Sequence, residues 1–220
     1  MNARPIIPAL LTLVIVAAHI GCSDRGPTEP SDQDSTHTGP IARKPNIYLY
    51  PTTNQQISVR VLFPSGGRIL ESHPAYGTGW VADVDPNGRI NQQYDYLYYE
   101  AQTADRYQYT FGWTIQRDTA ADFFRHVLHN GGFIEREIKD FLEYWVPRLT
   151  SANYYSVYPQ QRDLLENLIR LDVVPKPQTV LRLFFVIRTT EMLGAELPEP
   201  HLQSIQRTGY ALAEWGVVIQ

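Results

Sequence analysis

Two glutamates that stand beside aromatic residues are the side chains best suited to acid–base chemistry in this sequence. Glu100 follows two tyrosines in the stretch Tyr98-Tyr99-Glu100, and Glu214 precedes Trp215. A carboxyl group held against an aromatic wall is desolvated, which raises its pKa and suits it to act as a general acid. Two such groups on either side of a sugar bond would make a carbohydrate-active hydrolase. The spacing leaves their convergence open, because a strand glutamate beside a tyrosine can equally point outward or pair with an arginine.

Tyrosines recur at every second position in two neighbouring stretches of the sequence. This period places them on single faces of two expected strands: Tyr94, Tyr96 and Tyr98 on the first, Tyr107 and Tyr109 on the second. An exposed aromatic face could stack against the sugar rings of a glycan or receive an envelope protein. The alternative, which we favour, is that these rings are half-buried sheet residues beneath a pair of helices.

A histidine pair on an expected helix has the spacing of two metal ligands. His126 and His129 lie three positions apart, which puts both rings on one helix face. The sequence has no His-Glu-x-x-His motif and places no third ligand near them, so we expect surface histidines and no metal. Gly-x-Ser-x-Gly, Walker and Gly-x-Gly-x-x-Gly motifs are also absent from the sequence, so we expect no serine nucleophile elbow and no nucleotide cofactor.

The N-terminus has the pattern of an export signal. Arg4 supplies a positive start, the run Ile6 to Ala18 is almost purely apolar, and Gly21 and Cys22 follow soon after. An apolar run this short is typical of a cleaved signal peptide, since a membrane span needs about 20 apolar residues. The Gly-Cys pair resembles a bacterial lipobox, although His19 stands where that motif usually has Leu. The resemblance implies cleavage before Cys22 and diacylation of its thiol, which would hold the protein at a membrane.

We therefore expect three parts: a signal peptide at 1–21, a lipidated cysteine with a tether at 22–45, and one folded domain at 46–220. The tether is rich in Pro, Gly, Ser, Thr and Asp, and it has too little apolar surface to offset the entropy of ordering, so we expect disorder. Ser23 follows the cysteine where Asp is the usual signal for inner-membrane retention. This implies delivery to the outer membrane, if the host has one.

Composition narrows the classes of partner. The formal net charge is -4 and the sequence contains no run of Lys and Arg, so a nucleic-acid partner is not expected. Cys22 is the single cysteine, so no disulfide can form within one chain. Hydrophobic residues make up 43% of the sequence, which is enough for a packed core in a domain that we expect to be monomeric.

The elements that must position these residues follow from the hydrophobic period. Alternation and turn residues predict strands in the first half, at 46–51, 56–63, 79–84, 94–101 and 107–115. Helical spacing predicts two helices, from 118 to the Gly131-Gly132 pair and from 134 to Pro147, which should form an antiparallel pair. Strands return at 168–174, 179–188 and 212–219, and the run Val180 to Ile187 is apolar on nearly both faces, as in a central strand.

This order predicts an α+β domain with one or more mainly antiparallel sheets and a central antiparallel helix pair packed on one face. The run from 180 to 187 should pack against the second helix, so that Phe184 or Phe185 is fully buried.

Several segments together resemble a family of bacterial secreted and lipid-anchored proteins with no established activity. The family's Lys-Pro-x-Ile-Tyr-Leu-Tyr-Pro opening is matched at 44–51, and its C-terminal Glu-Trp-Gly is matched at 214–216. The family's Tyr-x-Tyr-Leu-aromatic-Trp-Glu segment resembles residues 96–100, where Tyr99 departs from the usual Trp, and Ala101 departs from the usual Gly that follows. The resemblance implies one domain with a secreted or lipid-anchored address, and it implies no chemistry.

Two functions from different classes remain. The first is an envelope lipoprotein whose domain is a non-enzymatic binding or structural module, with a glycan or an envelope protein as its partner. The second is a carbohydrate-active hydrolase that uses Glu100 and Glu214. The distance between these two carboxyl groups discriminates the hypotheses, because a hydrolase needs them in one cleft about 5 to 10 Å apart.

Overall fold

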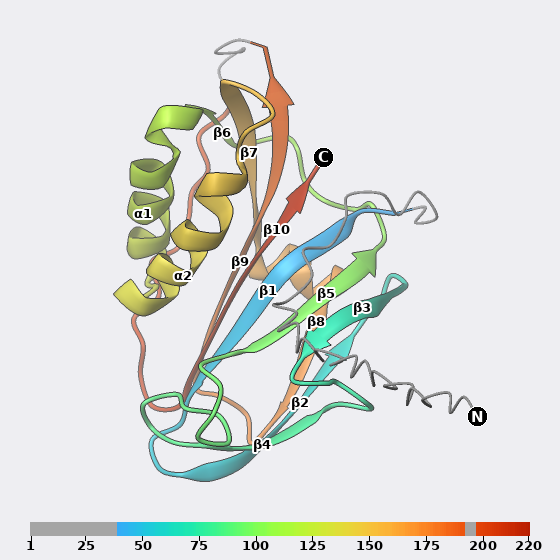
Figure 1. Ribbon diagram of the computed structural model, residues 1–220, viewed down its shortest axis with the longest axis vertical. Coiled ribbons are helices and arrows are strands. Elements are labelled where there is room, and N and C mark those ends of the chain that lie inside the picture. The colour runs from blue at the N-terminus through green and yellow to red at the C-terminus, as the bar shows by residue number, and fades with distance from the viewer. Residues whose placement is uncertain (1–38, 192–196) are drawn as a thin grey trace, which may run out of the picture. The chain divides into compact units, whose positions relative to one another are not determined.

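The computed structural model describes residues 39–191 and 197–220. The expected signal peptide, Cys22 and most of the expected tether lie outside the described residues. Within them, ten strands form two sheets that are mostly antiparallel, and three α-helices accompany the sheets (Figure 1). The fold is therefore a mixture of helices and mainly antiparallel strands, as expected. Among the described helices, none combines the length and the apolar composition that crossing a bilayer requires.

A seven-stranded sheet lies in the middle of the domain. Its strand order is β3-β5-β1-β10-β9-β7-β6, and all neighbours are antiparallel except β9 and β10, which run parallel. The first described strand, β1, therefore lies beside the last strand, β10. The strands are β1 Ile41–Tyr50, β3 Gly67–His73, β5 Leu97–Thr103, β6 Trp113–Gln116, β7 Tyr154–Gln161, β9 Thr179–Thr190 and β10 Ala211–Ile219.

A second sheet of three antiparallel strands has the order β4-β2-β8, with bounds β2 Gln55–Leu62, β4 Trp80–Val84 and β8 Arg170–Val174. Its strands β2 and β4 alternate between buried and more exposed positions, as the period of two predicts for a sheet with one solvated face. The inward residues Ile57 and Val59 are fully buried, while the outward residues Val81 and Val174 are 63% and 60% exposed.

The helices are α1 Ala120–Gly131, α2 Glu135–Trp145 and α3 Arg162–Leu168, and 3-10 turns cover Arg117–Thr119 and Val146–Arg148. Gly132 ends α1 in a left-handed conformation with φ of 102°, and its backbone N–H donates to the carbonyl oxygen of His129. Glycine is required there, because a Cβ would lie 2.4 Å from the carbonyl oxygen of Ile205. The second helix begins where the N–H of Ile134 donates to Oε2 of Glu137 at 3.0 Å, and it stops before Pro147.

Two separate cores flank the large sheet. Phe184 and Phe185, which are neighbours on β9, point to opposite faces and are both fully buried. Phe184 belongs to the cluster shared with the small sheet, and Phe185 belongs to the cluster that includes side chains of α1 and α2. The Phe185 ring lies 5.3 Å from the Phe124 ring and 5.7 Å from the Phe141 ring, measured between centroids. The prediction of a central, doubly buried strand is confirmed.

The sequence expectations were wrong in three places. The first strand begins at Ile41, so residues 41–45 belong to β1 and not to a disordered tether. The elements β3, β7 and α3 were not anticipated. The expected strand at 107–115 is irregular up to β6, because the Gln108 side chain accepts hydrogen bonds from the backbone N–H groups of Thr110 and Phe111, at 3.0 and 3.2 Å, and holds a turn.

Candidate functional site

Aromatic and charged side chains from three distant parts of the chain meet on one face of the large sheet, beside α2. Their centre is Lys44 of β1, whose ammonium group lies among the rings of Tyr96, Tyr98 and Tyr144. We call these four residues the tyrosine–lysine cluster. Carboxylates and a second cation stand close enough to influence the pKa values of the cluster, and these are Glu71, Glu100, Asp140 and Arg148.

The geometry of the cluster is that of a cation enclosed by aromatic rings. The Nζ atom of Lys44 is 4.2 Å from the centroid of Tyr98, 5.0 Å from that of Tyr96 and 5.3 Å from that of Tyr144. All three distances fall within the range of about 6 Å over which a ring attracts a cation. The ammonium also donates a hydrogen bond of 3.4 Å to the hydroxyl oxygen of Tyr96.

A bulge in β1 directs Lys44 into this position. Between Ala42 and Asn46 the strand has one residue more than its partner β5, and the register against β10 shifts at the same place. Lys44 lies in this bulge with φ of 52°, a left-handed conformation that costs a residue with a Cβ about 1–2 kcal/mol. Bulges of this kind re-aim a side chain and often lie beside functional sites.

Burial governs the electrostatics of the cluster. It lowers the pKa of the Lys44 ammonium, and the nearby carboxylates of Asp140 and Glu100 act in the opposite direction. Burial also raises the pKa of the Glu100 carboxyl, against the effect of Arg43, whose Nη1 lies 3.9 Å from Oε2 of Glu100. The pKa of Asp140 is likewise raised by burial, although its carboxylate accepts a hydrogen bond of 2.9 Å from the hydroxyl of Tyr48. The charges of Lys44, Glu100 and Asp140 are therefore partly withdrawn from water.

The structure brings together three of the residues predicted from sequence, Tyr96, Tyr98 and Glu100. Sequence reasoning missed Lys44, which it assigned to the tether, and Tyr144, which it treated only as part of a helix end. The period of two over residues 96–100 was a usable signal for the tyrosines and the glutamate. No local sequence pattern predicts the position of Lys44 in the site. That position depends on a bulge, which is defined only by the pairing of β1 with β5 and β10.

Glu214 does not join this group. Tyr99 and Glu100 are consecutive on β5 and point to opposite faces of the sheet, and the Tyr99 hydroxyl donates to Oε1 of Glu214 at 2.8 Å. The Glu214 carboxylate also accepts a hydrogen bond of 2.5 Å from Nε of Arg182. It therefore lies between the two sheets, whereas Glu100 lies on the side of Lys44. Glu100 and Glu214 therefore do not converge as the hydrolase alternative requires, because the pleat of the strand separates them.

The remaining tyrosines do not extend the cluster. Tyr94 precedes β5 and packs edge-on against His73 at 5.1 Å. Tyr107 is buried with its hydroxyl 2.7 Å from Oγ1 of Thr103, and burial raises its pKa to about 12. The guanidinium of Arg188 lies over the ring of Tyr109, with its Cζ atom 3.8 Å from the ring centroid. The two predicted rows of tyrosines on single strand faces are therefore wrong, since Tyr94, Tyr107 and Tyr109 stand outside regular strands.

The histidine pair lies on the exposed side of α1. His126 and His129 are both exposed, and Nε2 of His126 lies 2.9 Å from Nδ2 of Asn130. Across residues 39–191 and 197–220, no three His, Cys, Asp or Glu side chains gather as they would around a metal ion.

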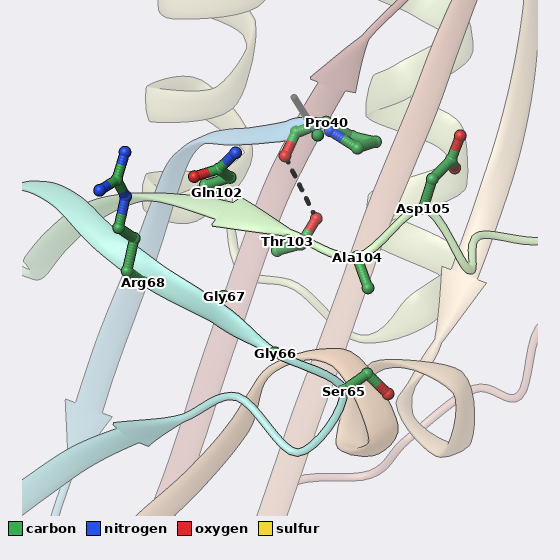
Figure 2. A pocket seen from close by; sticks show the side chains of 10 residues that line it. Pro40, Ser65, Gly66, Gly67, Arg68, Gln102, Thr103, Ala104 and Asp105 are labelled. Carbon is green, nitrogen blue, oxygen red and sulfur yellow. Dashed lines mark hydrogen bonds between the residues drawn. The ribbon is translucent and has the colours of Figure 1, made fainter. Parts of the chain in front are cut away.

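A hollow of about 540 Å³ at the ends of β3 and β5 offers less chemistry than the cluster (Figure 2). Gly66 and Gly67 form much of one wall, and the hydroxyl of Thr103 donates to the carbonyl oxygen of Pro40 at 3.3 Å. Its two charged residues, Arg68 and Asp105, are drawn at opposite sides of the view in Figure 2. We therefore base the functional argument on the tyrosine–lysine cluster.

No known protein family, curated protein or solved structure matches this chain.

Proposed function

We propose that this protein is an envelope lipoprotein, anchored through acylated Cys22, whose domain is a non-enzymatic binding module. The short apolar run at 6–18, the Gly21-Cys22 pair and the polar tether support the anchor. The resemblance to secreted and lipid-anchored bacterial proteins at 44–51 and 214–216 supports the same address, with delivery to the outer membrane if the host has one. Glu100 and Glu214 point to opposite faces of one sheet, so we do not carry the hydrolase forward.

The tyrosine–lysine cluster is the proposed binding surface, and its ligand class is an envelope glycan. Tyrosine rings stack on the apolar faces of sugars, and flanking carboxylates and guanidinium groups pair with sugar hydroxyls. Tyr96 and Tyr144 remain partly exposed, with the exposed Glu71 and Arg148 beside them. The observation that carries the proposal is the left-handed bulge at Lys44. Its strained backbone places a cation among three aromatic rings, and strain of this kind is concentrated at functional sites.

The proposal includes an antiparallel arrangement of α1 and α2 as a pair over one part of the large sheet. Phe141 and Trp145 of α2 are buried against the sheet, while Tyr144 on the same helix contributes its ring to the cluster. The helix pair would then form one wall of the binding surface and leave the tyrosine–lysine cluster open beside it.

The anchor is tested by Cys22→Ala, with Ser23→Ala as the matched control. Metabolic labelling with a radioactive fatty acid should label the native chain and the Ser23 variant, and it should not label the Cys22 variant. The Cys22 variant should also leave the membrane fraction. If it stays in the membrane with an intact N-terminus, the apolar run is a span and the lipoprotein assignment is refuted.

The binding surface is tested by Tyr144→Ala and Arg148→Ala, with Tyr94→Ala as a control that removes a half-buried tyrosine outside the cluster. Binding of the full chain to purified envelope polysaccharides is measured by biolayer interferometry. Tyr144→Ala and Arg148→Ala should each lose at least tenfold in affinity, and the control should keep the native affinity. Equal affinity of Tyr144→Ala and Tyr94→Ala would refute the surface. Binding to envelope proteins without binding to any polysaccharide would refute the glycan.

A further inference from the structure

A second candidate binding site lies on the opposite side of the large sheet, in a cavity of about 260 Å³ bounded by α3, β8, β9 and the loop that joins β8 to β9. The tyrosine–lysine cluster faces α2, whereas this cavity is lined in part by Arg182, whose partner Glu214 lies between the two sheets. The two sites can therefore be tested separately.

The lining of the cavity combines apolar and charged residues. Its apolar residues include Val173, Val180 and Leu212. Its charged residues comprise four cations and two carboxylates, namely Arg162, Arg170, Lys176 and Arg182 with Glu166 and Asp172. One of the two carboxylates, Asp172, is already paired with Arg60 of the neighbouring strand.

Arg182 is the most constrained of these cations. Its side chain is completely buried. Its Nε donates to Glu214 at 2.5 Å, and its Nη1 donates to Oε1 of Glu166 at 3.3 Å. Its Nη2 has no hydrogen-bond partner within the described residues. A buried donor without an acceptor costs about 1–3 kcal/mol, more when it is charged, so this nitrogen has a strong tendency to take an acceptor that enters the cavity.

The carboxylates do not neutralise the remaining cations. Glu166 is shared by three arginines, with contacts of 3.3 Å to Arg182, 3.6 Å to Arg162 and 3.8 Å to Arg170. Lys176 makes no ion pair or hydrogen bond within the described part of the chain. The cavity therefore keeps an excess of positive charge around a free guanidinium nitrogen, which is the arrangement that recognises oxyanions.

We propose that this cavity binds the oxyanion group of a small molecule, a phosphate or a carboxylate, through Arg182, Lys176 and the arginines that share Glu166. One oxygen of the ligand accepts from Nη2 of Arg182. The less polar remainder of the ligand lies against Val180 and Leu212. The site is additional to the proposed glycan surface and does not depend on it.

The test is calorimetric titration of the full chain in detergent with sodium phosphate and with sodium acetate, each against sodium chloride at matched ionic strength. One of the two oxyanions should bind saturably with one site per chain, and the preferred anion identifies the ligand group. Arg182→Lys retains a charge beside Glu214 but cannot place a second nitrogen in the cavity, so it should weaken binding at least tenfold.

A matched pair of surface variants tests the proposal independently, in case the Arg182 variant does not fold. Lys176→Ala removes a charge at the cavity, and Lys139→Ala removes the same charge from an exposed position on α2. Lys176→Ala should weaken binding severalfold, and Lys139→Ala should leave it unchanged. The proposal is overturned if neither anion binds saturably, or if the two lysine variants bind alike.

Discussion

Replacing Lys44 by alanine and by glycine separates the strain of its backbone from the contacts of its side chain. Both changes remove an ammonium that lies 4.2 Å from the Tyr98 centroid, a contact worth about 0.5–2 kcal/mol and partly offset by the desolvation that lowers the pKa of Lys44. Alanine keeps a Cβ at φ of 52°, so Lys44→Ala should lose about 1 kcal/mol of the free energy of unfolding.

Glycine has no Cβ, so it avoids about 1–2 kcal/mol of left-handed strain in the folded state. Its greater freedom in the unfolded chain lowers the free energy of unfolding by about 0.4–1 kcal/mol. Lys44→Gly should therefore be about 0.5–1 kcal/mol more stable than Lys44→Ala. At Lys139, an exposed position inside α2, the order should reverse, because glycine in a helix costs about 1 kcal/mol relative to alanine.

Urea denaturation of the four variants, with shared slopes, measures both differences. The reasoning about the bulge is refuted if alanine equals or exceeds glycine at position 44 while the expected order holds at position 139. That result would mean that β1 relaxes out of its left-handed conformation without cost.

Three further predictions use the same denaturation assay. Phe185→Ala should cost about 3–5 kcal/mol, whereas Val174→Ala at a 60% exposed site should change stability by less than about 0.5 kcal/mol. Glu214→Gln leaves Arg182 buried beside a neutral group and should cost about 3–5 kcal/mol; a native-like midpoint would show that the pair is dispensable. Burial raises the pKa of Glu100, so its stabilising contribution is full below the unfolded pKa and is lost as the pH rises through the folded one. Glu100→Gln should therefore gain stability relative to the native chain as the pH rises above the ordinary carboxyl pKa of about 4, and a difference that does not change with pH would contradict this.

The hydrophobic period predicted those elements in which the apolar residues of the sequence match the faces that are buried in the fold. The run at 180–187 is apolar on both faces because Phe184 and Phe185 enter different cores, and this pattern is visible without a structure. By contrast, β7 carries tyrosines, glutamines and Pro159, and its burial comes from its neighbours β6 and β9 rather than from its own composition. Residues 41–45 were mistaken for tether because their pairing partners lie more than 50 positions away.

The candidate sites were predictable only where one strand carried the information. Tyr96, Tyr98 and Glu100 fall on one face of a single stretch, and the period of two identifies them. The partners of these residues come from β1 and α2, and their approach depends on a bulge and on the docking of a helix. The same limit left the placement of Glu214 open. Each glutamate has an aromatic neighbour, but only the sheet shows that Tyr99, and not Glu100, faces Glu214.

Because β10 pairs with both β1 and β9, the large sheet cannot form completely until the last strand of the domain has been synthesised. The nine residues of β10 supply Leu212 and Val218 to one core and Trp215 and Val217 to the other. Until these residues are synthesised, β1 and β9 each present an unpaired edge. Such edges invite pairing with other chains. A truncation before residue 211 would therefore open both cores at once.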